Sequence, residues 1–347
     1  MKKASSFLLA FLLILTACNP STKKSSDTND SVFLFSYFTS QDGGLRLAWS
    51  NDGLTWTPIE KADGTSFLTP LVGEDRLMRD PSICQGPDNT FHMVWTSSWT
   101  DRIIGYASSK DLIHWSEQKA IPVMMHEPEA HNCWAPELFY DNTTGLFWIF
   151  WATTIPGRHS EVAESEREKG LNHRIYAVTT KDFSTFSPTF MLFNPDFSAI
   201  DAAIVKSPID GSLIMTVKNE NPNPPEKNIR IVHLSQMPPS GEEMSATSCG
   251  MSAISEPIHG NYWAEGPSPL FVNDTLYVYY DCYMNHRYGA ARSTDNGFSW
   301  EVVDSLVTFP RGMRHGTAFS VTKGFLQQLL AQVDSLNAQP SEQPKDN

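Results

Sequence analysis

Ionisable residues recur at the start of short apolar segments whose composition predicts β-strands. Asp80 begins DPSICQG, Asp201 begins DAAIVKS, Glu265 begins EGPSPLFV and His315 begins HGTAFSV. Aligned on their apolar residues, these four segments share one starting position, which Ala135 occupies in a fifth segment, WAPELFYD. Like charges held close together raise one another's pKa, so burying several carboxylates costs stability unless function requires them. The pattern therefore predicts a group of catalytic acids.

The segments belong to a repeat that runs through most of the chain. Each copy has an aromatic-rich strand, a short gap, and a second strand that leads into a polar or glycine-containing turn. The aromatic strands begin at Phe33, Phe91, Phe147, Leu213 and Leu276, and the second strands begin at Leu45, Ile103, His173, Asn228 and Tyr288. A period of about 55–70 residues built of short strands is typical of a β-propeller, so five copies predict an all-β fold with five blades.

The first copy has no strand ahead of Phe33, while the strand at His315 has no copy of its own. We therefore expect the C-terminal strand to pair with the N-terminal blade and close the ring, which removes exposed sheet edges. Closure brings the starts of all five innermost strands around one central pocket. Glu137 follows Ala135 by two residues, so the strand period predicts that it faces the same side.

The two ends of the chain differ in composition from the repeats. A basic start, a short apolar stretch and the sequence Leu15-Thr16-Ala17-Cys18 predict a lipoprotein signal peptide over residues 1–17, with Cys18 lipidated after cleavage. An ordinary secretory signal with a chance cysteine is the alternative. Residues 18–30 are polar and predict a flexible tether. The propeller is expected over residues 31–330, and residues 331–347 are expected to form a disordered tail.

Composition narrows the class of partner. The formal net charge of −13 argues against binding to nucleic acid. Ten Trp, ten Tyr and twenty Phe provide many rings; most are expected between blades, and some could stack on sugar. The spacing of Cys84, Cys133, Cys249 and Cys282 matches no metal motif, so these residues are either buried free thiols or disulfide partners that the sequence cannot pair.

As an ordered set, the motifs resemble glycoside hydrolase family 43. They are RDPSI at residues 79–83, WAPEL at 134–138, AIDAAI at 199–204, EGPSPL at 265–270 and RHGT at 314–317. The resemblance implies Asp80 as general base, Glu265 as general acid, and Asp201 as the residue that orients the acid and tunes its protonation. It also implies inversion of anomeric configuration. The sequence departs from the family at Glu137, where many members have Asp, and this departure predicts an altered choice of substrate.

Other residues are candidates for binding substrate. They are Arg79, Trp95, Trp134, Glu137, Trp151, Arg314 and His315. For each tryptophan, packing between blades is the alternative, and for each arginine it is a structural ion pair. The resemblance also implies that His315 faces the central channel, where some members hold a structural calcium ion; a hydrogen-bonded core histidine is the alternative. No metal ligand is assigned, and no cofactor is expected to be required.

Together these observations predict an exported bacterial lipoprotein, anchored to a membrane by its lipid alone, that acts on an oligosaccharide or polysaccharide. The expected activity is the inverting, exo-acting removal of terminal α-L-arabinofuranosyl or galactosyl units from arabinan or arabinogalactan. The protein is expected to be a monomer. Residues 50–56 and 293–300 resemble the Asp-box turns of sialidases, but a sialidase needs six blades and a group of arginines that the repeats do not supply. A glycan-binding lipoprotein without activity is the other alternative, although all three acids are present.

Overall fold

The computed structural model describes residues 30–39, 43–160, 162, 170–221 and 226–338. The signal peptide, Cys18 and most of the tether lie outside the described residues.

The strands of the described residues form five antiparallel sheets. In four of these sheets the strands follow one another in sequence order, from the innermost strand to the outermost. Blade 2 holds β4 (Arg79–Gln85), β5 (Phe91–Thr96), β6 (Ile104–Ser109) and β7 (Lys119–Ile121); blade 3 holds β8 (Trp134–Asp141), β9 (Leu146–Thr154), β10 (His173–Thr180) and β11 (Phe190–Phe193); blade 4 holds β12 (Ala199–Lys206), β13 (Leu213–Asn219) and β14 (Asn228–Leu234); blade 5 holds β15 (Glu265–Val272), β16 (Thr275–Cys282), β17 (Arg287–Ser293) and β18 (Glu301–Val302).

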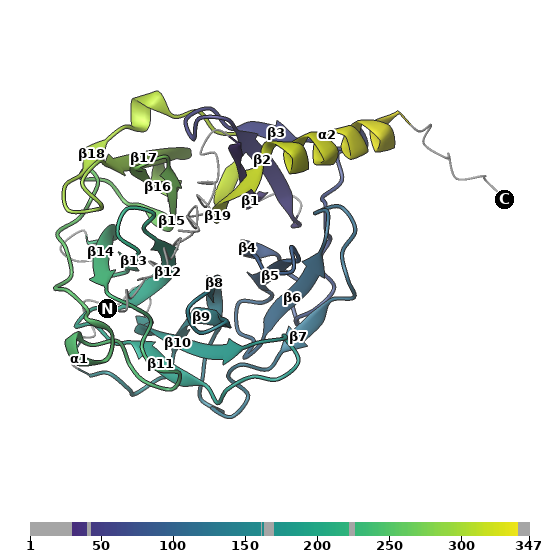
Figure 1. The fold of residues 1–347 in the computed structure, drawn as a ribbon. Helices are drawn as coiled ribbons and strands as arrows, with labels where there is room; N and C mark the ends of the chain where they lie inside the picture. The colour runs from purple at the N-terminus through teal and green to yellow at the C-terminus, as the bar shows by residue number, and fades with distance from the viewer. Residues whose placement is uncertain (1–29, 40–42, 161, 163–169, 222–225, 339–347) are drawn as a thin grey trace, which may run out of the picture. The chain divides into compact units, whose positions relative to one another are not determined.

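Blade 1 combines both ends of the propeller, because the last strand, β19 (Met313–Thr322), lies inside β1 (Ser31–Thr39), β2 (Arg46–Ser50) and β3 (Thr57–Ile59). The pairing of β19 with β1 extends from Ser31 opposite Thr322 to Thr39 opposite Met313. The innermost strands contact one another in the cyclic order β4, β8, β12, β15 and β19, and they surround the centre in Figure 1. The predicted five-bladed propeller and its closure by the C-terminal strand are confirmed.

Closure depends on a close approach at Gly316. A Cβ added there would lie 1.8 Å from the carbonyl oxygen of Ser36 on β1. We therefore expect Gly316→Ala to force β19 and β1 apart and to lower the free energy of unfolding by about 1–3 kcal/mol, as overpacking usually does. Denaturant unfolding measures this change. Gly324→Ala is the matched control, because a Cβ at Gly324 would meet only the Thr322 hydroxyl at 3.9 Å; equal losses in both variants would contradict the expectation.

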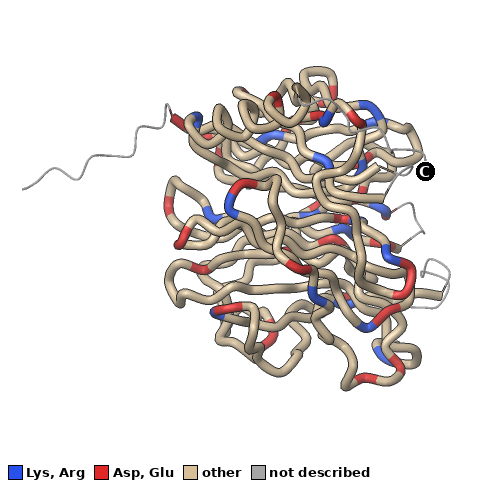
Figure 2. Tube along the Cα trace, turned by 90° about the vertical axis from the view of Figure 1, so that its right-hand side faces the viewer, with Lys and Arg blue, Asp and Glu red and all other residues tan. Residues whose placement is uncertain are grey.

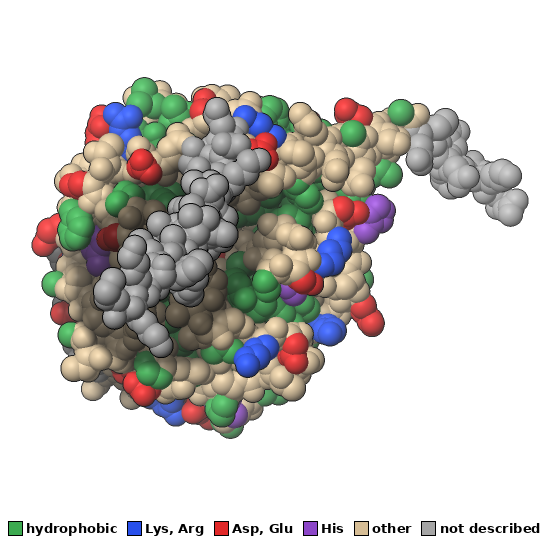
Figure 3. Space-filling view, in the orientation of Figure 1, with side chains coloured by type: hydrophobic (Ala, Val, Ile, Leu, Met, Phe, Trp, Pro, Cys, Tyr) green, Lys and Arg blue, Asp and Glu red, His purple; other side chains and the backbone are tan. Residues whose placement is uncertain are grey.

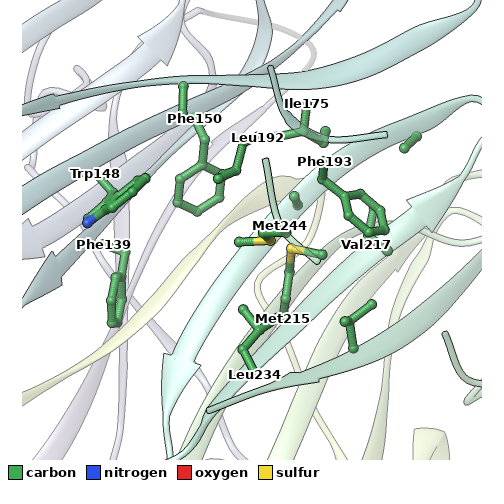
Figure 4. Packing of buried hydrophobic residues seen from close by; sticks show 14 of the residues in the cluster. Phe139, Trp148, Phe150, Ile175, Leu192, Phe193, Met215, Val217, Leu234 and Met244 are labelled. Carbon is green, nitrogen blue, oxygen red and sulfur yellow. The ribbon is translucent and has the colours of Figure 1, made fainter. Parts of the chain in front are cut away.

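Apolar side chains fill the spaces between blades. The cluster between blades 3 and 4 joins aromatic rings of β8 and β9 to aliphatic side chains of β13 and β14. In Figure 4, Met215 and Met244 point toward each other at the centre of this cluster, with Phe150 and Phe193 beside them. Burial of this kind stabilises the ring by about 25 cal/mol per Å² of apolar surface removed from water. It therefore fixes the inner strands that carry the site.

The turns that resemble Asp boxes are structural. In the first, the Ser50 hydroxyl accepts from the Gly53 amide at 2.9 Å, and the Asp52 carboxylate accepts from the Thr55 amide at 2.9 Å. The same bonding pattern recurs at residues 109–115, 180–186 and 293–300. In two of these copies Leu112 and Phe183 take the left-handed backbone position that glycine takes in the others. The sequence pattern missed those two copies because it required that glycine.

The C-terminal helix corrects the predicted end of the domain. Helix α2 (Lys323–Asn337) begins after Thr322, whose hydroxyl accepts from the Phe325 amide, and it continues past residue 330. Val333 is buried against blade 1 and blade 2 residues. The Asn337 side chain donates to the Glu60 carbonyl at 3.1 Å. Residues 331–337 are therefore part of the packed unit, because the helix has an apolar face; residues 339–347 of the expected tail lie outside the described residues.

Two further findings concern the described part of the chain. Cys84, Cys133, Cys249 and Cys282 are all free thiols, and all except Cys84 are buried. No helix among the described residues has the length and apolar composition needed to cross a membrane. This part also contains the short helix α1 (Ala246–Cys249) and 3₁₀ turns at Tyr283–Asn285 and Asp304–Leu306. In the view of Figure 2, acidic and basic positions are interspersed along the Cα trace.

Candidate active site

Each innermost strand bulges at its start, and the bulge carries the site. The register of pairing with the neighbouring aromatic strand shifts between Arg79 and Ser82 in β4, and between Ile200 and Ala203 in β12. Asp80 and Asp201 occupy these bulges with left-handed backbone, at φ 52° and 54°. Residues other than glycine rarely adopt this conformation, and it costs of order 1–3 kcal/mol at a site that the surrounding fold holds in place. The two aspartates are therefore equivalent in the repeat, as the sequence predicted.

The position of Glu265 differs by one residue from the position that the sequence alignment gave it. In β15 the pairing shifts between Glu265 and Ser268, and the left-handed position belongs to Gly266, at φ 59°. Glu265 is therefore equivalent to Arg79 rather than to Asp80. A Cβ on Gly266 would lie 2.3 Å from the ring of His315, so an acid at that position would not fit. The general-acid candidate reaches the centre from the preceding residue instead.

Asp80 is held as an ionised carboxylate. Its Oδ1 lies 3.2 Å from Nδ1 of His315, and its Oδ2 accepts from the Thr96 hydroxyl at 2.8 Å. Burial alone would raise the pKa of Asp80, but the hydrogen bond and charge of His315, together with the charge of Arg79, outweigh burial and hold the pKa at about 2. Asp80 is therefore ionised at neutral pH, which is the form that a general base requires.

The pKa of Asp201 is shifted in the opposite direction to that of Asp80. Burial raises the pKa of Asp201 to about 6, and the neighbouring carboxyls of Glu265 and Asp80 contribute to the rise. Its Oδ2 accepts from the Gly266 amide at 2.9 Å, and its Oδ1 lies 3.9 Å from His315 Nδ1. Burial would lower the pKa of His315, but Asp201 and Asp80 together raise it to about 9. An imidazolium therefore lies between the two aspartates at neutral pH.

The raised pKa of Asp201 predicts a stability change with pH. The folded protein holds this proton more tightly than the unfolded chain, whose ordinary pKa is 3.8. The stabilisation is therefore complete below pH 3.8 and is lost as the pH rises through 6. Asp201→Asn removes this titration and can still accept from the Gly266 amide. We expect the variant to gain roughly 1–3 kcal/mol relative to the natural protein between pH 4 and pH 7. Denaturant unfolding at several pH values measures the difference, and a difference independent of pH would contradict the assignment.

Glu265 lies between two cations. Its Oε2 is 3.3 Å from Lys218 Nζ, and its Oε1 is 3.1 Å from Arg314 Nη2. Arg314 is held in turn by Asp281, with 2.5 Å between Nε and Oδ2. Burial raises the pKa of Asp281 to about 6. The side chain of Glu265 is 22% exposed, which leaves it partly accessible to solvent.

Three of these partners were missed by the sequence reasoning: Thr96, Lys218 and Asp281. Each is the sixth residue of its aromatic strand, in FHMVWT, LIMTVK and LYVYYD. Each lies on the aromatic strand beside the bulge, opposite Arg79, Ile200 and Glu265. Aligning the ends of the aromatic strands, rather than only the starts of the innermost strands, would have found them.

Two of the predicted substrate-binding tryptophans belong to the core. Trp95 is 0% exposed and packs against Gly105, where a Cβ would lie 2.0 Å from its ring. Trp151 is 1% exposed, and its Nε1 donates to the Thr153 hydroxyl at 3.0 Å. Both face the spaces between blades because they alternate with residues directed at the other side of their strands. A substrate-binding role for Trp95 and Trp151 is therefore wrong.

Glu137 is also placed differently from the prediction. The bulge at Ala135, at φ 46°, breaks the strand period on which the prediction depended. Glu137 is 4% exposed and accepts from the hydroxyls of Ser82 and Thr317, the latter at 2.7 Å. It therefore joins three inner strands at the centre of the ring, and burial raises its pKa. Direct contact with substrate is not compatible with this position.

Arg79 and Trp134 lie at the starts of β4 and β8 and contact Trp99. The guanidinium of Arg79 is between the rings of Phe38 and Trp99, 4.6 Å from each ring centre. The indole of Trp134 donates to the Trp99 carbonyl at 3.0 Å. Trp99 is 46% exposed, so this cluster offers an aromatic surface beside Asp80. Figure 3 shows one face of the molecule hollowed beside the grey atoms near its centre, with hydrophobic side chains in the hollow. Binding of sugar by Arg79, Trp134 and Arg314 stays a prediction.

The surroundings of His315 bear on the predicted calcium ion. Its side chain is 7% exposed, and its Nδ1 faces Asp80 and Asp201. Because the imidazole is protonated at neutral pH, it competes with a cation for the same carboxylates. Among the described residues, no three His, Cys, Asp or Glu side chains are arranged to hold a metal ion. A structural calcium ion near His315 and the alternative of a hydrogen-bonded core histidine both stay predictions.

Comparison with known proteins gives the family. Residues 30–325 match the model of a family described as a probable glycosyl hydrolase domain, related to family 43. No protein of curated function matches. The structure is similar to a thermostable family-43 glycoside hydrolase, with a TM-score of 0.50 and 17% identity over 69% of this chain and 78% of that one. For an α-L-arabinofuranosidase from Lactobacillus brevis the TM-score is 0.47 and the identity 17%, over 65% of this chain and 72% of that one. For the Bacteroides ovatus protein described as xyloglucan PUL GH43B the TM-score is 0.48 and the identity 19%, over 71% of this chain and 43% of that one. Because the family model covers the whole propeller, this chain belongs to the family-43-related glycoside hydrolases.

Proposed function

We propose that this protein is an inverting, exo-acting glycosidase that removes terminal α-L-arabinofuranosyl or galactosyl units from arabinan or arabinogalactan. One observation carries the mechanism: of the three acids, Asp80 and Glu265 have partly exposed side chains, at 12% and 22%, whereas the side chain of Asp201 is 6% exposed. Their strands, β4 and β15, are not neighbours in the ring, because β19 lies between them. This arrangement supports two carboxyl groups acting from different sides of one sugar.

The chemistry then divides between the two carboxyls. Asp80 accepts a proton from a water molecule, and the water oxygen forms a bond to the anomeric carbon. Glu265 donates its proton to the glycosidic oxygen as the bond between that oxygen and the anomeric carbon breaks. The transferred protons leave Asp80 protonated and Glu265 ionised until they exchange with solvent. An inverting enzyme needs about 6.5–9.5 Å between such carboxyls to admit the water. Asp201 orients Glu265 through its bond to the next residue's amide.

The substrate class rests on the resemblance of the ordered motifs to glycoside hydrolase family 43, in which some galactan-active and arabinogalactan-active relatives carry Glu at the position of Glu137. The buried position of Glu137 moves the expected source of specificity from that residue to the cluster around Trp99. There, the ring of Trp99 and the guanidinium of Arg79 provide a surface on which the apolar face of a sugar can stack. The natural partner is accordingly a plant cell-wall oligosaccharide or polysaccharide.

The test is hydrolysis of a panel of aryl glycosides: α-L-arabinofuranoside, β-D-galactofuranoside, β-D-galactopyranoside and β-D-xylopyranoside, with arabinogalactan alongside. Proton NMR of the first product formed from an active substrate reports the anomeric configuration. Release of the opposite anomer from the arabinofuranoside or a galactoside supports the proposal. Retention of configuration would overturn the inverting mechanism, and turnover of the xyloside alone would overturn the substrate class. Binding of arabinogalactan without any turnover would indicate a glycan-capture protein.

The remaining proposals concern the protein's setting. We place it as an exported lipoprotein whose Cys18 carries the lipid, so that the membrane is contacted through the anchor alone, at the periplasmic side or the cell surface. Incorporation of labelled palmitate into the protein in cells, with loss of the label when Cys18 is replaced, is the corresponding measurement. We also propose that the enzyme acts as a monomer without a cofactor; full activity after dialysis against a chelator supports the second point.

A further inference from the structure

Two buried lysines lie close to the general-acid candidate in blade 4. The side chains of Lys218 and Lys227 are 2% and 4% exposed, and both ammonium groups contact Glu220, at 2.5 Å from Oε2 and 2.9 Å from Oε1 respectively. Each also lies over an aromatic ring: Lys218 is 5.2 Å from the centre of Tyr283, and Lys227 is 5.0 Å from the centre of Trp263. The two lysines therefore share burial, partner and ring contact.

They differ in their relation to Glu265. Lys218 contacts Oε2 of Glu265 at 3.3 Å. Lys227 contacts Glu220, which contacts Lys218, so two residues stand between Lys227 and the acid. The other oxygen of Glu265 meets Arg314 at 3.1 Å. Cations from β13 and β19 thus fix both ends of the carboxyl group. Rotating the group would break at least one of these contacts.

We propose that Lys218, held in place by Glu220, is a positioning residue for Glu265 and directs its proton to the leaving-group oxygen. This inference rests on the glycosidase function proposed above. A general acid must lie within hydrogen-bond reach of the oxygen that it protonates, and a small misplacement of a catalytic group can slow a reaction about 10²-fold. An ammonium group and a guanidinium only donate hydrogen bonds. Neither Lys218 nor Arg314 can therefore accept the proton of Glu265.

The role can be separated from a merely structural one by varying the leaving group. A 2,4-dinitrophenyl group departs without protonation, whereas a phenyl group needs the acid. Removing a residue that acts through the acid should therefore slow the phenyl glycoside selectively. General loosening of the pocket would slow both substrates alike. The ratio of the two kcat values is the measured quantity.

The experiment compares Lys218→Met with Lys227→Met, its matched control, and uses Glu265→Gln as the reference for complete loss of the acid. We expect Lys218→Met to lower kcat for the phenyl glycoside by about 10²-fold and to change the dinitrophenyl glycoside little. Lys227→Met should leave the ratio unchanged, and Lys218→Arg should restore part of the loss. Should Lys218→Met not fold, Lys218→Gln keeps a hydrogen-bond donor without the charge and allows the same comparison.

The outcomes separate the two proposals. If Glu265→Gln alone changes the ratio, while Lys218→Met behaves as Lys227→Met does, the positioning role is wrong and the glycosidase mechanism stands. If Glu265→Gln itself hydrolyses the phenyl glycoside at the natural rate, the assignment of the general acid fails first. A loss in Lys218→Met that is equal for both leaving groups would also overturn the positioning role.

Discussion

Glu265→Gln should lower kcat on the phenyl glycoside or on arabinogalactan by about 10²–10⁴-fold, because the variant has no proton to give to the leaving oxygen. The 2,4-dinitrophenyl glycoside should retain much of its rate, since its leaving group needs no protonation. The substitution keeps the shape of the side chain. Its amide nitrogen, however, replaces one of the two oxygens that accept from Lys218 and Arg314. Steady-state kinetics on the two substrates measures the effect.

Folding has to be separated from catalysis in this variant. Loss of one ionic contact beside two cations should lower its thermal stability, so circular dichroism and a melting curve belong with the kinetics. A folded variant that is equally slow on both leaving groups would show that Glu265 does not act as the acid. Retention of most activity on the phenyl glycoside would exclude the role directly.

Asp80→Asn should abolish turnover on every substrate while leaving sugar binding largely intact. The variant can still accept from the Thr96 hydroxyl, so the side chain should keep its place, but it cannot accept a proton from water. We expect a decrease in kcat of at least about 10²-fold, the lower end of what a general base contributes. Unlike Glu265→Gln, the loss should be the same for phenyl and dinitrophenyl leaving groups. Kinetics with both substrates, together with calorimetric titration of the product sugar, gives the measurement.

A matched control for this change is Asp88→Asn, because Asp88 lies on an exposed turn where it pairs with Lys110. The control should keep full activity. A folded Asp80→Asn variant that retains turnover would contradict the assignment of the base. Loss of sugar binding together with turnover would indicate that Asp80 holds the substrate instead.

The sequence alone predicted the propeller because its information is periodic. Five aromatic strands and a C-terminal strand without a copy of its own were enough to predict five blades and the closure that β1 and β19 make. Sequence also identified Asp80, Asp201 and Glu265 as a set, because acids at the starts of apolar strands are conspicuous. Lys218 and Asp281 also recur at one position of the repeat, because each is the sixth residue of its aromatic strand.

Only the tertiary structure decided how these residues face one another. The bulges at Asp80, Asp201 and Gly266 shift the strand register, and a shift of one residue changes the direction of a side chain. Strand periodicity therefore misplaced Glu137. Alignment on the apolar residues matched Glu265 with Asp80, although its equivalent in the structure is Arg79. Burial decided the roles of Trp95 and Trp151, because whether a ring faces a neighbouring blade or the pocket depends on residues distant in sequence. Charges depend on the same packing: Asp80 and Asp201 are alike in sequence, and their contacts with His315 and their burial give them opposite protonation behaviour.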